Sequence, residues 1–196
     1  LLSGLLDTIY RNIYPIVIGK LFSASSLGHY TRAHQFSEFP SSNITGIIKR
    51  VTYPVLCSIQ NDDERLSNIY RRFLKLSAFV IFPMMTGLSA VSKPLIFITI
   101  GSQWEICAIL LPIICFSMMW YPVHSINLNL LQVKGRSDLF LRLEIIKKLL
   151  GVLVICITAP WGLVVMCYGS IVSSLIALVI NTYYTGKLIH IGFFKQ

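Results

Sequence analysis

The sequence predicts an all-α integral membrane protein, a bundle of six transmembrane helices. The chain is 55% hydrophobic and only 13% charged, with a mean hydropathy of +0.70, whereas a typical soluble domain is about a quarter charged. It also contains long uncharged runs, and the run from Leu149 through Gly186 is too long for one span of about 20 residues. We therefore expect lipid to cover much of the exterior.

The breaks in the apolar runs define the individual spans. Pro160-Trp161-Gly162 divides the last run into two helices, because it combines a turn signal with an interfacial aromatic residue. A second uncharged run, from Ile106 to Val133, gives another helix, and a third apolar stretch ends just before Lys93. The predicted helices in chain order are residues 1–22, 34–59, 66–92, 105–133, 138–159 and 162–188.

The first two predicted helices carry charge where a membrane span rarely does. Residues 1–22 contain Asp7 and Arg11, and residues 34–59 contain Glu38 and the pair Lys49-Arg50. We expect the second helix to face a polar interior of the bundle. The alternative is an amphipathic helix that lies on the membrane surface.

The basic residues are divided unequally between the two sides of the predicted bundle. Three of them, Lys20, Arg32 and Lys93, belong to one side. The other side has thirteen: Lys49, Arg50, Arg65, Arg71, Arg72, Lys75, Lys134, Arg136, Arg142, Lys147, Lys148, Lys187 and Lys195. This positive-inside bias predicts that both ends of the chain are cytoplasmic. It also explains the net charge of +9 without a nucleic-acid partner.

No motif predicts a catalytic or metal centre. The five cysteines form no CxxC pair and lie in mostly apolar stretches, and the four histidines lack metal-ligand spacing. We therefore expect no disulfide, no metal, no cofactor and no enzyme activity. The chain begins within an apolar helical pattern rather than with a signal peptide, which is what we expect of a piece of a longer protein.

The charged first helix provides the first candidate binding residues. Asp7 and Arg11 are one helical turn apart and can pair on one face, and Asn12 extends the polar character. Charges at membrane depth usually face a partner or a water-filled cavity. The two interpretations that stay open are a cavity for an anionic or sugar-bearing ligand and a purely structural ion pair.

Three further candidates lie elsewhere in the chain. Arg32 is either a solvated residue of the connection before the second helix or, within that helix, a bidentate ligand for phosphate or pyrophosphate. Asn127 and Asn129 are near the cytoplasmic end of the fourth predicted helix and are candidates for contact with a ligand.

Several short segments together resemble one family. They are GHYTRA at 28–33, RVTYPV at 50–55, Gly101 with Trp104, and LLQVKGRSD at 130–138. In this order and spacing they are similar to the bacterial polysaccharide flippases, the Wzx-type exporters of lipid-linked oligosaccharides within the MOP superfamily. The resemblance covers nearly the whole chain.

The resemblance implies a transporter with two helical lobes around a central cavity. Such a protein moves an undecaprenyl-pyrophosphate-linked oligosaccharide across the bacterial inner membrane by alternating access, for lipopolysaccharide, capsule or exopolysaccharide synthesis. This chain would be the second lobe, with the N-terminal lobe of the same protein and membrane lipids as partners, and with one or two further helices after Gln196. Arg11 and Arg32 would hold the pyrophosphate, and Asp7 would position Arg11.

Two other functions remain as alternatives. A multidrug or small-cation antiporter of the same fold needs buried carboxylates, for which Asp7, Glu38 and Glu144 are available. A membrane enzyme of glycan assembly generally carries large outward loops, whereas the predicted outer connections are short.

Overall fold

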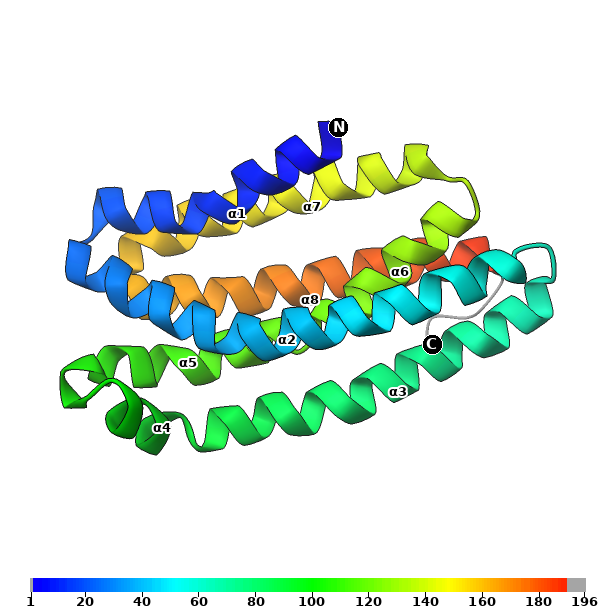
Figure 1. Cartoon of the computed structure of the whole chain (residues 1–196). Helices are drawn as coiled ribbons and strands as arrows, with labels where there is room; N and C mark the ends of the chain where they lie inside the picture. The colour runs from blue at the N-terminus through cyan, green and yellow to red at the C-terminus, as the bar shows by residue number, and fades with distance from the viewer. Residues whose placement is uncertain (1, 190–196) are drawn as a thin grey trace.

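The chain folds into long helices joined by short turns. The computed structural model describes the backbone of residues 2–189 and the side chains of residues 12–189. Over the described backbone there are eight α-helices, two short 3₁₀ turns and no strand, so the all-α prediction is confirmed. The α-helices are α1 (Leu2–Leu21), α2 (Ala24–Ser58), α3 (Asp63–Ala90), α4 (Ser92–Thr99), α5 (Glu105–Met118), α6 (Tyr121–Val133), α7 (Ser137–Thr158) and α8 (Leu163–Leu188), and the 3₁₀ turns are Ser102–Trp104 and Ala159–Trp161 (Figure 1).

Three stretches of the described chain are long and apolar enough to cross a membrane. They are α3, the continuous stretch Ser102–Val133 and α8. Helix α7 has the length of a span, at 22 residues, but the four charged residues from Arg142 to Lys148 lie near its middle. The chain is therefore a helical membrane protein in which some long helices carry more charge than an ordinary span.

The predicted number of six helices is wrong. A separate short helix, α4, follows α3, and the predicted helix 105–133 consists of two pieces, α5 and α6, with a break at Met119 and Trp120. If α5 and α6 are counted as one kinked helix, the described chain has seven helices. Pro122 explains the break, because proline has no backbone N–H with which to continue the hydrogen-bond pattern of α5.

Helix α2 begins ten residues earlier than the sequence predicts. Ser23 has an extended backbone, and its hydroxyl accepts a hydrogen bond from the backbone N–H of Ser26 at 3.1 Å. This is a helix N-cap, which satisfies one of the backbone donors that a helix start leaves without a partner. Arg32 therefore lies inside α2 and not in the connection before it.

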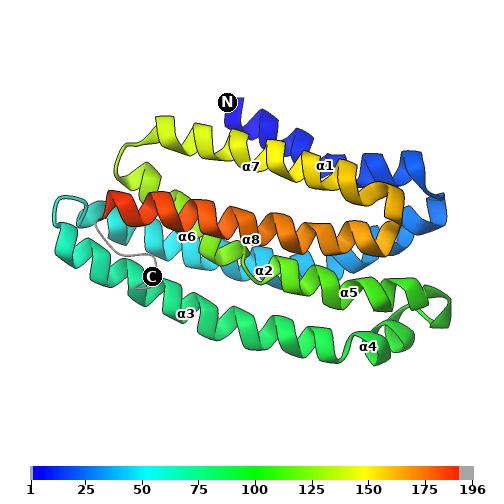
Figure 2. The same cartoon turned by 180° about the vertical axis from the view of Figure 1, so that it is seen from behind.

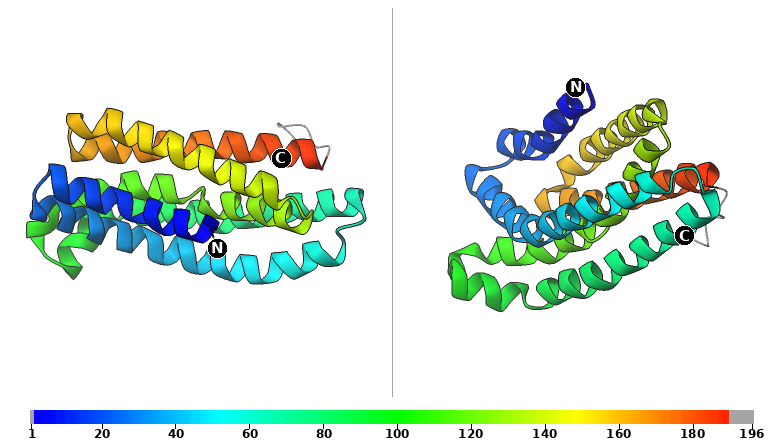
Figure 3. Two further views of the ribbon diagram at one scale, coloured as in Figure 1. Left: turned by 90° about the horizontal axis from the view of Figure 1, so that it is seen from above. Right: turned by 45° about the vertical axis from the view of Figure 1, so that its right-hand side comes forward.

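Helices α5 and α6 form the most buried stretch of the bundle. Helix α2 packs along both of them, and α3 packs against the same two helices and against α2. Helix α8 contacts α5, α6 and α7, and α1 contacts α2 and α7 (Figures 1 and 2). The long helices run along one common direction, as expected for a bundle that crosses a membrane (Figure 3).

The buried apolar side chains form two separate clusters, one at each end of the bundle. We call them the α5 core and the α6 core. The α5 core surrounds α5 and includes Ile18, Tyr30, Ile81, Met85, Ile96, Leu110, Leu111, Ile155 and Met166. The α6 core surrounds α6 and consists of Leu56, Leu66, Tyr70, Leu74, Ile126, Leu130, Val133 and Ile189.

Polar side chains occupy the level between the two cores. We call this group the polar waist. Its members on α2 and α3 are buried, and those at the α5–α6 break and on α8 are partly buried. They are Ser41, Thr45, Ser77, Ser117, His124 and Ser174.

Candidate functional site

The predicted ligand residues on α1 and α2 lie on the bundle surface where they are described. The side chains of Asp7 and Arg11 lie outside the described residues, so their pairing stays a prediction. Asn12 is exposed on α1. Arg32 is exposed on α2, where its guanidinium donates a hydrogen bond to the Oε1 atom of Gln35 at 3.1 Å.

Aromatic contacts hold α1 and the start of α2 together beside Arg32. The rings of Tyr14 and Tyr30 are stacked with their centroids 6.0 Å apart. The ring of His29 meets Trp104 edge-on at 5.1 Å, so the connection before α5 also packs here. This segment therefore fixes the position of α2 and presents Arg32 on its outer side.

Asn127 and Asn129 are buried on α6, each only 1% exposed. The Tyr70 hydroxyl donates a hydrogen bond to Oδ1 of Asn127, which links α3 to α6. The side-chain amide nitrogens of both asparagines are buried without a hydrogen-bond partner among the described residues. Since Asn127 lies in the α6 core and Arg32 lies beside the α5 core, these two predicted residues do not belong to one site.

A cluster of charged side chains lies halfway along α7, and the sequence analysis missed it. Glu144 forms ion pairs with Lys147 and with Lys148, the latter at 3.4 Å, and these side chains are only 12–13% exposed. Lys147 is the eleventh residue of the helix, about 15 Å from its start at 1.5 Å per residue. Two lysines around one glutamate give the cluster a net positive charge. Such charges at membrane depth are usually functional.

His124 on α6 and Asn181 on α8 lie next to this cluster. The amide nitrogen of Asn181 is 3.3 Å from Nδ1 of His124, and Nε2 of the same ring is 3.4 Å from the Ser174 hydroxyl. Because an amide nitrogen only donates, Nδ1 accepts and the proton of the neutral ring is on Nε2. Helix α7, which carries the charged cluster, packs against both α6 and α8.

The sequence did contain a signal for this cluster. Lys147 and Lys148 contribute to the positive charge predicted for one membrane side, but they follow Glu144 by three and four residues. That spacing places all three side chains on one face of a helix. These three residues lie well inside the predicted helix 138–159 and not in a loop. That position, and not the count of positive charges, indicates a charged site within the bundle.

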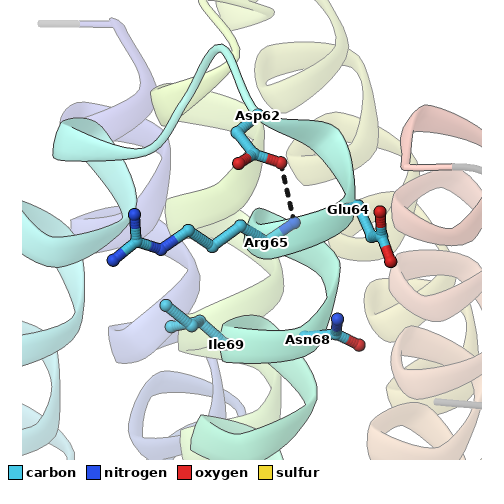
Figure 4. Close-up of a pocket in the computed structure, with 5 residues that line it drawn as sticks. All are labelled: Asp62, Glu64, Arg65, Asn68 and Ile69. Atoms are coloured by element: carbon cyan, nitrogen blue, oxygen red, sulfur yellow. Dashed lines mark hydrogen bonds between the residues drawn. The ribbon is translucent and has the colours of Figure 1, made fainter.

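A shallow surface hollow lies at the turn between α2 and α3, where Asp62, Glu64, Arg65, Asn68 and Ile69 line it (Figure 4). Asp62 caps α3, because its carboxylate accepts a hydrogen bond from the backbone N–H of Arg65 at 2.9 Å. Lys134, at the end of α6, donates hydrogen bonds to Asp63 and to the backbone carbonyl of Gln60. These contacts account for the charged turn as a capped helix start that is tied to α6.

The described residues contain no group of three or more His, Cys, Asp or Glu side chains that could hold a metal ion. The five cysteines are free thiols. The cationic groups of the described part include the ion cluster of α7 and the exposed Arg32.

The chain is similar in sequence to several bacterial proteins that are named for polysaccharide biosynthesis. The chain is 25% identical to the lipopolysaccharide biosynthesis protein WzxC of Escherichia coli K12, over 92% of this chain and 36% of WzxC. It is 28% identical to the teichuronic acid biosynthesis protein TuaB of Bacillus subtilis, over 70% of this chain and 28% of TuaB. It is also 28% identical to the succinoglycan biosynthesis transport protein ExoT of Rhizobium meliloti, over 45% of this chain and 18% of ExoT.

The match to WzxC spans about a third of that relative's length. No solved structure matches the chain significantly. A family model described as polysaccharide biosynthesis protein matches residues 1–109, which is more than half of the 196 residues. This match confirms the family predicted from the sequence segments, and the chain belongs to the polysaccharide biosynthesis protein family.

Proposed function

We propose that this chain is part of an exporter of lipid-linked oligosaccharide. The exporter moves an undecaprenyl-pyrophosphate-linked glycan across the bacterial inner membrane by alternating access and catalyses no covalent reaction. The observation that carries the proposal is a helical membrane chain in a polysaccharide biosynthesis family, one relative of which is named as a transport protein. The complete exporter includes an N-terminal lobe that contributes the other wall of its cavity.

The proposed orientation has both ends of the chain on the cytoplasmic side. Lys147 and Lys148 are largely buried within the bundle and paired with Glu144, so they do not belong in the comparison of loop charges. Without them the basic residues number eleven on one side against three on the other. The positive-inside bias keeps its direction.

In this proposal, cationic side chains hold the pyrophosphate while the lipid tail stays in the bilayer. Arg11, positioned by Asp7, and Arg32 are the proposed pyrophosphate ligands, with Asn12 beside them. Two observations support this role for Arg32. Its side chain is exposed, and among the described residues its guanidinium forms a hydrogen bond only with Gln35. Asn127 and Asn129 remain proposed glycan contacts, which requires that the α6 core open during transport.

The test replaces Arg11 and Arg32 separately by alanine in the full-length protein and measures surface polysaccharide at matched protein levels. Loss of a charge-assisted contact predicts a fall in export of about tenfold or more for each variant. Arg32→Lys keeps the charge but not the bidentate geometry and is expected to be intermediate. Arg72→Ala, an exposed arginine on α3, is the control. Normal export by both alanine variants would exclude the proposed pyrophosphate site.

The antiporter alternative is less well supported than export. Its cation site needs a buried carboxylate, and Glu144, which is largely buried, is already paired with two lysines. Glu38 is partly exposed and lies 3.3 Å from His34. Transport of a cationic dye by the full-length protein would favour the antiporter, and glycan-joining activity in membranes would favour an enzyme.

A further inference from the structure

The break between α5 and α6 lies within a stretch that is long and apolar enough to cross a membrane. A regular helix would join the backbone N–H of residue 122 to the carbonyl of Met118. Pro122 has no N–H, so that carbonyl loses its partner within the helix. The interior of a membrane offers no water to replace the missing donor.

Hydroxyl groups from two other helices donate hydrogen bonds to the backbone carbonyls at the break. Ser41 on α2 donates a hydrogen bond to the carbonyl of Met118 at 3.0 Å. Ser174 on α8 donates one to the carbonyl of Ser117 at 3.1 Å. The Ser117 hydroxyl in turn donates to the carbonyl of Ser170, also at 3.1 Å. The break is thus held from both sides by single hydrogen bonds between helices.

The same break separates the two apolar cores. α5 packs within the α5 core and α6 within the α6 core, and the polar waist lies between them. Interdigitated apolar side chains resist relative movement, because cores are as densely packed as organic crystals. Hydrogen bonds from serine hydroxyls are easier to exchange, because the hydroxyl rotates and can bond instead to a carbonyl of its own helix.

One polar group at the break is not satisfied in this conformation. The indole N–H of Trp120 is buried and has no hydrogen-bond partner among the described residues. An unsatisfied buried donor is unfavourable, and it indicates either strain or a second arrangement in which the donor is paired. Its position in the break, between two cores, favours the second arrangement.

We propose that the α5–α6 break is a hinge, and that the Ser41–Met118 and Ser174–Ser117 hydrogen bonds hold it in one of two states. In the other state both bonds are released, and α6 moves with the α6 core relative to α5. The existence of two states rests on the proposed alternating-access function. The experiment that tests the hinge measures a distance within the protein and does not depend on transport.

The experiment places spin labels at Ile106 and Gln132, exposed positions near the outer ends of α5 and α6, in the full-length protein. Cys57 and Cys156, the two cysteines that are not buried, are replaced first. Pulsed electron paramagnetic resonance then gives the distribution of distances across the hinge. Ser41→Ala and Ser174→Ala are each expected to change the ratio of two distance populations by about threefold, the effect of one ordinary interhelical hydrogen bond.

Two serines of the same helices are matched controls. The Ser37 hydroxyl bonds only to carbonyls of its own helix, and so does the Ser170 hydroxyl. Ser37→Ala and Ser170→Ala should leave the distances unchanged. Pro122→Ala restores the missing N–H and should shift the distribution toward a single, straighter population.

Distances that are the same in the wild type, Ser41→Ala, Ser174→Ala and Pro122→Ala would overturn the hinge, as would equal shifts in the control variants. Ser41→Thr and Ser174→Thr keep a hydroxyl and should retain the wild-type ratio, which separates release of the hydrogen bond from general loss of packing. A shifted distribution with unchanged polysaccharide export would leave the hinge standing and count against the proposed transport function.

Discussion

The α5 core and the α6 core differ in what surrounds their apolar side chains. The α5 core is the larger one and draws on α1 to α5, α7 and α8, with the stacked rings of Tyr14 and Tyr30 and the buried His29 at its α1 side. The α6 core is smaller, and the Tyr70–Asn127 hydrogen bond and the buried amide of Asn129 lie within it. We therefore expect the larger α5 core to be the more stable end of the bundle, and the α6 core to be the part that moves at the proposed hinge.

The largest expected effect is on the free energy of unfolding when a buried leucine is truncated in each core. Leu111→Ala in the α5 core and Leu130→Ala in the α6 core each truncate a fully buried leucine. We expect Leu111→Ala to lower the free energy of unfolding by about 4 kcal/mol and Leu130→Ala by about 2–3 kcal/mol, because a less rigid site collapses around the cavity. Unfolding in mixed micelles with increasing SDS measures both. Equal losses would remove the distinction between the two cores.

The next effect concerns the ion cluster of α7. Glu144→Gln leaves Lys147 and Lys148 without their carboxylate. We expect a loss of about 2–3 kcal/mol, less than for a fully buried pair because these side chains keep some exposure. The double variant Glu144→Gln/Lys147→Met restores part of the charge balance and should be more stable than Glu144→Gln alone. The same SDS titration compares them, and a fully stable Glu144→Gln protein would show that the cluster is solvated.

The smallest expected effect concerns the hydrogen bond within the α6 core. Tyr70→Phe removes the hydroxyl that donates to Asn127 and leaves a buried carbonyl oxygen without this donor. Interhelical hydrogen bonds in membranes contribute about 0.6 kcal/mol on average, and we expect a loss of about 1 kcal/mol. Tyr53→Phe, at an exposed position on α2, is the control. A loss as large as that of Leu130→Ala would mean that polar contacts dominate this core.

Long apolar runs made three membrane-spanning stretches predictable from the sequence. The start of α2 was not predictable by hydropathy, because His29 and Arg32 made the first turns look like a loop, whereas the Ser23 cap decided the start. The α5–α6 break was missed because Pro122 lies in an uncharged run, and hydropathy does not register a missing N–H.

The predicted ligand residues show a similar limit. Residue type identified Arg32 and Asn127 as unusual in a membrane helix, but not that one faces outward and the other lies in the α6 core. The predicted helix 138–159 already contains Glu144, Lys147 and Lys148, but hydropathy and charge counting do not show that these side chains pair within the bundle. Only the three-dimensional packing of α6, α7 and α8 brings His124 and Asn181 beside it.

The length of α2 has a consequence for how the protein meets its surroundings. Its 35 residues extend about 52 Å at 1.5 Å per residue, whereas the hydrocarbon core of a bilayer is about 30 Å thick. Even a strongly tilted helix of this length reaches into the aqueous phase, and α3 returns alongside it. The turn around Gln60 is therefore a water-exposed tip, where an epitope tag would show which side of the membrane it occupies.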